Sequence, residues 1–129
     1  MDEIKFRAFD FTTNKMDSWE DILYEYENAR IAFTERYMLV PMQYTGIKDD
    51  GGNEIYDGDI VRVWEQSING GIFTHICKVY QAENGTWMME GRPEHNKSYR
   101  TKLELYSHRK KVDVIGNCFE NIDLAEAAK

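Results

Sequence analysis

The stretch MQYTGIKDDGGNEIYDGDIVRV, residues 42–63, decides the fold class. Its two ends are rich in aromatic, aliphatic and β-branched side chains, which favour strands. Between them, residues 49–53 and 57–59 contain mostly glycine, asparagine and aspartate, and these residue types mark tight turns. We therefore predict strands joined by short turns, with one strand at 60–64 that begins directly after the turn at 57–59.

Short apolar runs continue on both sides of this stretch and are separated by polar turns. The predicted strands lie at residues 4–9, 37–40, 42–48, 60–64, 72–80, 87–89 and 112–116. Asn84-Gly85 is the strongest hairpin signal, because both residue types accept the positive φ angles that a two-residue turn requires. Strands at this spacing are typical of a small barrel or a sandwich.

Four segments outside these strands need separate arguments. Residues 17–33 suit a helix near 18–28, but they also suit two short strands. Residues 91–101 are polar and predict an exposed loop, and residues 103–106 suit either a strand or a helical turn. Asn121 predicts the start of a short C-terminal helix, because asparagine is a favourable capping residue.

Length and charge restrict the classes of protein to consider. The 129 residues fit one domain with a core large enough to fold alone. Sixteen Lys and Arg residues stand against 23 Asp and Glu residues, and the net charge of −7 argues against general affinity for nucleic acids or anionic membranes. The sequence has neither an apolar run of the roughly 20 residues that span a bilayer nor a signal-peptide pattern, so we expect a cytoplasmic protein.

Recognisable motifs for metals, cofactors and catalysis are missing from the sequence. Cys77 and Cys118 belong to no CxxC pair, and we expect both to be reduced and packed as small apolar side chains. The acidic turns fit no EF-hand register, and no phosphate-binding glycine loop or nucleophile elbow occurs. We therefore predict no metal, no cofactor, no catalytic residue and no enzymatic activity. In the rival enzyme hypothesis, Asp57 and Asp59 would be the acidic groups of the site.

One segment departs from the acidic composition. Residues 92–111 contain seven basic and two acidic residues, and aromatic side chains lie between them. Such a mixture can bind single-stranded nucleic acid, with cations on phosphates and rings under bases. The candidate residues are Arg92, Lys97, Tyr99, Arg100, Lys102, Arg109, Lys110 and Lys111. The other interpretations are a solvated surface, or a head-to-tail contact with the acidic segment 17–27 of a second copy.

Residues 42–63 resemble the signature of the YopX protein family, which runs MQYTGLKDxxGxEIYEGDIV in this region. KFRAFD at 5–10 and Lys15-Met16 resemble the family's KFRAWD and KM, and VIGNCFEN at 114–121 resembles its VIGNIYEN. The chain departs from these patterns at Phe9, Cys118 and Ile122, where the family has a tryptophan, an aliphatic residue and often a proline. The first two are exchanges of one packing side chain for another.

The resemblance implies a small protein of bacterial phages or prophages, mainly β and barrel-containing, with no established activity. Together with the strand pattern, it leads us to expect one mainly β (α+β) domain over residues 1–129. Its parts would be an N-terminal hairpin with an acidic segment (1–41), a small SH3-like β-barrel core (42–117) and a C-terminal helix or tail (118–129). The polar signature residues that we select as candidate binding residues are Gln43, Thr45, Lys48, Asp57 and Asp59.

We expect a non-enzymatic phage or prophage accessory protein that acts by binding other proteins. Its partners would be a host protein and further copies of itself in the cytoplasm of the bacterial host, with no membrane involved. Binding of nucleic acid through residues 92–111 is the alternative hypothesis.

Overall fold

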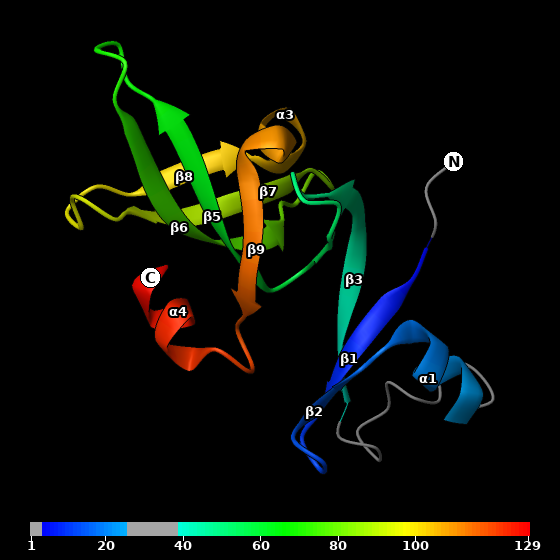
Figure 1. Ribbon diagram of the computed structural model, residues 1–129. Helices are drawn as coiled ribbons and strands as arrows, with labels where there is room; N and C mark the ends of the chain where they lie inside the picture. The colour runs from blue at the N-terminus through cyan, green and yellow to red at the C-terminus, as the bar shows by residue number, and fades with distance from the viewer. Residues whose placement is uncertain (1–3, 26–38) are drawn as a thin grey trace.

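The computed structural model describes residues 4–25 and 39–129, and it is mainly β (Figure 1). The strands are β1 (Phe6–Asp10), β2 (Lys15–Asp17), β3 (Leu39–Lys48), β4 (Glu54–Tyr56), β5 (Asp59–Gln66), β6 (Ile72–Gln81), β7 (Trp87–Pro93), β8 (Thr101–Glu104) and β9 (Val112–Asn117). The helices are α1 (Trp19–Glu25), α3 (Leu105–His108) and α4 (Ile122–Ala127), with a 3-10 turn, η2 (Arg109–Lys111). None of these described helices is long and apolar enough to cross a membrane.

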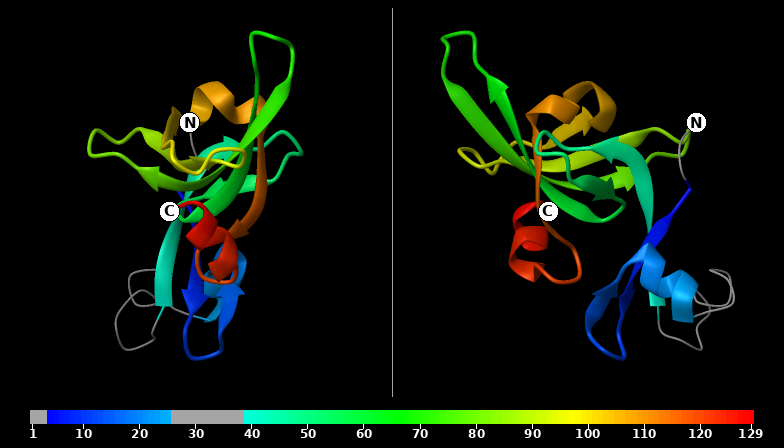
Figure 2. Two further views of the ribbon diagram at one scale, coloured as in Figure 1. Left: turned by 90° about the vertical axis from the view of Figure 1, so that its left-hand side faces the viewer. Right: turned by 45° about the vertical axis from the view of Figure 1, so that its right-hand side comes forward.

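The strands form two antiparallel sheets that meet at the signature stretch. The first sheet has the order β2-β1-β3-β4, and the second has the order β8-β7-β6-β5-β9. β3 pairs with β1 through its first half and with β4 through its second half. Figure 2 shows the second sheet curling into a half-barrel, with the first sheet extending away from it. The long strand β3 therefore connects the two parts of the molecule.

The main core fills the half-barrel. Its fully buried residues are Ile55, Val61, Val63, Cys77, Val79, Met89, Leu105 and Val112. Alternate residues of β5 and β6 supply half of this set, as expected for strands with one face on a core. A separate apolar cluster of Ala8, Ile22 and Leu39, with Trp19 packed against it, holds α1 on the first sheet.

Most of the predicted elements are confirmed. The strands predicted at 60–64, 72–80 and 112–116 lie within β5, β6 and β9. The helix predicted near 18–28 is present as α1, and the Ser18 hydroxyl accepts a hydrogen bond from Asp21 N at 3.1 Å. The rest of that prediction, and the first two residues of the strand predicted at 37–40, lie outside the described residues.

The predicted polar loop at 91–101 is shorter than its composition suggested. β7 continues through Pro93 and β8 begins at Thr101, because both ends of the segment pair with neighbouring strands. Residues 103–106 contain both of the structures considered for them, since β8 ends at Glu104 and α3 begins at Leu105.

The hairpin predicted at Asn84-Gly85 and the helix predicted to start at Asn121 are both present, but the turn type and the capping bond predicted for them are wrong. In the β6–β7 hairpin only Gly85 has a positive φ, of 90°, and its N–H donates to Ala82 O at 2.9 Å. This is a three-residue loop with a left-handed glycine and not a two-residue turn. The Asn121 side chain makes no helix-capping bond. Its Oδ1 instead accepts a hydrogen bond at 3.0 Å from the backbone N–H of Asn117, the last residue of β9.

Candidate functional site

Asp59, at the start of β5, is fully buried and bound through both carboxylate oxygens. Arg7 of β1 donates to Oδ1, and the backbone N–H of Tyr56 donates to Oδ2 at 2.7 Å. The Arg7 guanidinium also lies over the Tyr56 ring, 4.5 Å from its centroid. Burial raises the pKa of Asp59 to about 6, although the charge of Arg7 favours the ionised form. This carboxylate therefore ties β1 to the signature turn and faces no open space.

A second cation of the N-terminal segment makes a similar arrangement. Lys5 forms an ion pair with Glu54 of β4, and its Nζ lies 4.9 Å from the centroid of the Tyr44 ring. The Tyr56 hydroxyl donates to Glu54 at 3.1 Å, and the rings of Tyr44 and Tyr56 are 5.4 Å apart. Burial, with the nearby Glu54 charge, raises the pKa of Tyr56 to about 12. Each of these two tyrosine rings of the signature thus contacts a cation of the N-terminal segment.

The other candidates on β3 do not converge on one site. The Thr45 hydroxyl is buried and donates to Ile55 O at 2.8 Å, which joins β3 to β4. The backbone carbonyl of Gln43 accepts a hydrogen bond from Asp57 N at 2.9 Å, which does not involve the Gln43 side chain. Lys48 is exposed at the end of the strand. The Thr45 hydroxyl therefore binds the backbone, and Lys48 faces solvent. These residues do not form a common site.

Asp57 lies beside a small hollow of about 140 Å³. The hollow is lined by Val40, Pro41, Met42, Asp57, Gly58, Lys78, Cys118 and Phe119. Burial raises the pKa of Asp57, and the charge of Lys78 acts against this shift. Asp59 does not line the hollow, so the two carboxylates of the turn do not face a common space.

A larger groove of about 620 Å³ lies between α4 and the outer face of β6 and β7. We call it the α4 groove; it is lined by Lys78, Tyr80, Glu90, Arg100, Cys118, Phe119, Ile122, Ala125, Glu126, Ala128 and Lys129. Arg100 donates to Glu90 Oε2 at 2.6 and 2.9 Å and to the carbonyl of Lys129 at 2.5 Å. Sequence reasoning missed this groove, because its members come from four separate segments.

The basic residues of 92–111 divide into engaged and free groups. Arg92 donates to Lys97 O at 2.8 Å, and Arg100 is held in the α4 groove. Arg109 lies 4.1 Å from the centroid of the exposed Tyr106 ring. The exposed lysines that form no ion pair with another described residue are Lys97, Lys102, Lys110 and Lys111. The stretch therefore presents fewer available cations than its composition indicates.

A hydrogen-bonded cluster at the other end of the half-barrel also escaped sequence reasoning. His75 is buried, with Nδ1 2.8 Å from Thr101 Oγ1 and Nε2 3.2 Å from Glu65 Oε2. His108 Nε2 lies 3.8 Å from the other oxygen of Glu65. No spacing in the sequence connects these residues. Within the described ranges, no group of three or more His, Cys, Asp or Glu residues could hold a metal ion.

Comparison with known proteins identifies a family and a fold. The chain matches the YopX protein family over residues 5–126. It is also similar to a solved structure, the crystal structure of protein EF1440 from Enterococcus faecalis, with 19% sequence identity and a TM-score of 0.53. That likeness covers 96% of this chain and 99% of the other, and at this identity it shows the fold alone. Among curated proteins, none matches this chain.

Proposed function

Because the chain belongs to the YopX protein family, we propose that it is a phage or prophage accessory protein that binds other proteins and catalyses no reaction. Its partners would be a protein of the bacterial host and further copies of itself in the host cytoplasm. The observation that carries this proposal is a contrast between two places. The buried polar side chains of the signature, Thr45, Asp49 and Asp59, are bound within the chain, whereas the α4 groove leaves apolar side chains open to a partner.

The internal use of the signature supports binding over catalysis. Catalysis requires polar groups aimed at a shared space in which a substrate can react. Asp49 Oδ1 accepts a hydrogen bond from Asn53 N at 2.8 Å, and its Oδ2 accepts one from Val114 N at 2.9 Å. Asp59 is likewise bound by Arg7 and by a backbone N–H. These acidic groups hold turns and strands in place, so the motif needs no substrate to explain it.

The α4 groove has the composition of a protein-binding surface. Ile122, with 66% of its surface exposed, lies at the groove together with Phe119. The charged residues around them form the ion pairs Arg100–Glu90 and Lys129–Glu126. An apolar centre with a polar rim is typical of protein interfaces, since the centre excludes water and the rim remains solvated.

The proposal is tested by affinity capture from a lysate of phage-infected host cells, with and without nuclease. We expect one host protein at a stoichiometric level that survives nuclease treatment. An Ile122→Glu variant should lose this protein, because the charge enters the α4 groove. Ile68→Glu is the matched control, since Ile68 is fully exposed and lies outside the groove. Equal capture by both variants would contradict the assignment of the groove.

Nucleic-acid binding by residues 92–111 is the second candidate function. It is favoured by the four exposed lysines without ion pairs and by Tyr99, whose side chain is 65% exposed. Against it stand the engaged side chains of Arg92, Arg100 and Arg109. Recovery of a mixture that disappears on nuclease treatment would favour this candidate.

A further inference from the structure

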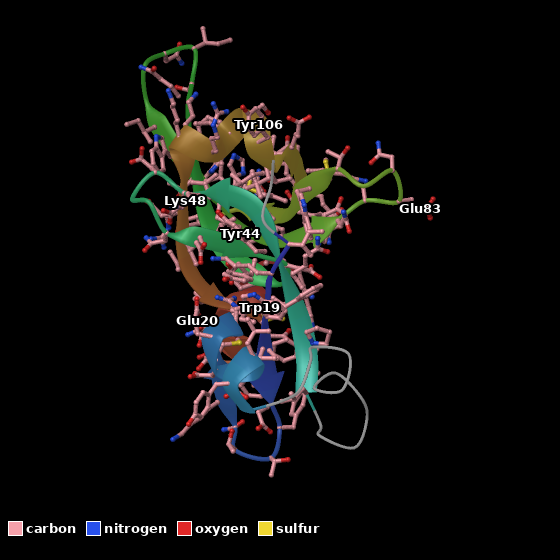
Figure 3. The ribbon with its side chains drawn as sticks, turned by 90° about the vertical axis from the view of Figure 1, so that its right-hand side faces the viewer. Trp19, Glu20, Tyr44, Lys48, Glu83 and Tyr106 are labelled. Atoms are coloured by element: carbon pink, nitrogen blue, oxygen red, sulfur yellow. The ribbon has the colours of Figure 1, made fainter. Side chains whose placement is uncertain are left out.

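Helix α1 presents an acidic and aromatic surface to solvent. Ile22 is buried and Trp19 packs in the same cluster, so these two residues fix the inner side of the helix. The residues left exposed are Glu20, Asp21, Leu23 and Tyr24, and Tyr24 is 91% exposed. Glu20 and Tyr24 are four residues apart and therefore share one side of the helix. Figure 3 shows Glu20 directed away from the molecule.

The α4 groove contains one cation, Lys78, that is not already in an ion pair with an acidic residue of the groove. Two of its cations, Arg100 and Lys129, already pair with Glu90 and Glu126. Lys78 is exposed and forms no ion pair with any residue in the described part of the chain. It lines both the groove and the adjoining hollow, where the half-buried Asp57 is the nearby acid. The groove thus combines an available cation with an apolar floor.

The α1 helix of the same chain is placed away from this groove. Its inner side packs on Ala8 and Leu39 of the first sheet. In Figure 1 and in the right-hand view of Figure 2, α1 and α4 lie apart, on different sides of the molecule. An α1 helix that occupies the groove must therefore come from a second copy.

We propose that α1 of one copy docks in the α4 groove of the next, with Glu20 beside Lys78 and Tyr24 against Phe119 and Ile122. This inference rests on the proposed self-association and names the two surfaces that perform it. A second copy and a host protein would then compete for the α4 groove. At about 1.5 Å per residue, the seven-residue α1 is roughly 10 Å long, so about two turns of helix would enter the groove. In the proposed arrangement each copy gives its α1 to one neighbour and its groove to another, so the contact is heterologous and produces a ring or an open chain of copies.

Sedimentation velocity and native mass spectrometry on purified protein test the proposal. We expect the wild-type chain to form assemblies larger than a monomer at low salt. Glu20→Lys and Lys78→Glu should each weaken association about tenfold or more, because attraction becomes repulsion. Glu83→Lys and Lys110→Glu carry the same charge changes outside both surfaces and should leave association unchanged. Tyr24→Ser should also weaken it without touching any charge.

Mixing the two charge variants gives a result that only a heterologous contact predicts. The Lys78→Glu chain keeps an intact α1, and the Glu20→Lys chain keeps an intact groove. Their equimolar mixture should therefore regain assemblies larger than a dimer, because the native charge pair forms at one contact and the swapped charges attract at the next. A chain that carries both reversals should regain assembly, because its swapped charges attract again.

The unfavourable outcomes separate the two proposals. Wild-type assemblies that persist in Glu20→Lys, Lys78→Glu and Tyr24→Ser would overturn the docking of α1 while self-association stands. A wild-type chain that stays monomeric at all concentrations and salt levels would overturn both. Dissociation by Lys110→Glu but not by Lys78→Glu would place the acceptor surface in residues 92–111.

Discussion

Arg7 and Asp59 lie 52 positions apart in the chain, yet they form the ion pair that joins the first sheet to the start of the half-barrel. Asp59 is fully buried, and only 18% of the Arg7 side chain is exposed. Since a buried charge without a partner is costly, each residue requires the other. The pair therefore fixes where β1 lies relative to β5.

Replacing Arg7 by leucine should lower the free energy of unfolding by about 3 kcal/mol, because Asp59 keeps its burial and loses its counter-charge. Urea unfolding followed by circular dichroism measures this loss. Arg62→Leu is the control, since Arg62 forms an exposed pair with Glu94 and should cost less than about 1 kcal/mol. Equal losses of unfolding free energy in the two variants would show that the buried Arg7–Asp59 pair contributes no more to stability than an exposed pair.

The raised pKa of Asp59 gives the folded state a defined dependence on pH. This pKa is about 6 in the folded chain against an ordinary value of 3.8, so the folded state binds the proton more tightly. The resulting stabilisation is complete below the unfolded pKa and is lost as the pH rises through the folded pKa. Between these values, the free energy of unfolding should fall by up to about 1.4 kcal/mol per pH unit.

The measurement is urea unfolding at several pH values between about 4 and 7, on the wild-type chain and on Asp59→Asn. The asparagine cannot titrate, so the difference between the two profiles isolates the contribution of Asp59. The wild-type stability should decline relative to the variant over this window. Parallel profiles would contradict the proton linkage.

The strands of the half-barrel were predictable because their signals are local. In β5 and β6, runs of apolar and β-branched residues follow turns of glycine, asparagine and aspartate. The family resemblance rested on motifs at both ends of the chain and in its middle. The match to the YopX family over residues 5–126 confirms that resemblance. Residues 17–33 were ambiguous because Trp19 and Ile22 become helical through packing on Ala8 and Leu39, which no local pattern contains.

The candidate site was less predictable, because partners distant in the chain decide what a polar residue does. Asp59 was selected as a candidate binding residue, but within the chain Arg7 and the backbone of Tyr56 bind it. In the basic stretch, charge counting treated Arg100 and Lys110 alike. Only the folded chain shows that Arg100 is held by Glu90 and that Lys110 is exposed.

Gly91 shows how a close backbone contact can escape sequence reasoning and still decide stability. A Cβ at this position would lie 1.8 Å from Ile76 O and 2.7 Å from Cys77 Cα, and neither backbone atom can move aside without opening the β6–β7 pairing. Gly91→Ala should therefore lower the free energy of unfolding by about 4 kcal/mol or prevent folding. Thermal unfolding by circular dichroism checks this.

Gly71→Ala is the matched glycine control. Its new Cβ would meet only the Ser67 hydroxyl at 3.4 Å, at the tip of the β5–β6 hairpin. We expect a change in stability within about 0.5 kcal/mol, as for an ordinary surface substitution. A Gly91→Ala chain as stable as Gly71→Ala would show that β6 and β7 are not packed this closely.

The four exposed lysines of residues 92–111 allow a direct test of whether this stretch binds single-stranded nucleic acid. We expect no binding of fluorescent single-stranded oligothymidine by anisotropy, because the chain carries a net charge of −7 and three arginines of the stretch are engaged internally. Binding through phosphates would instead weaken steeply between about 50 and 200 mM salt. If such binding occurs, the double variant Lys110→Glu with Lys111→Glu should reduce both the affinity and its salt dependence, whereas Lys15→Glu outside the stretch should not. That result would transfer the function from the α4 groove to residues 92–111, since each lysine removed lowers the number of counterions that the nucleic acid releases on binding.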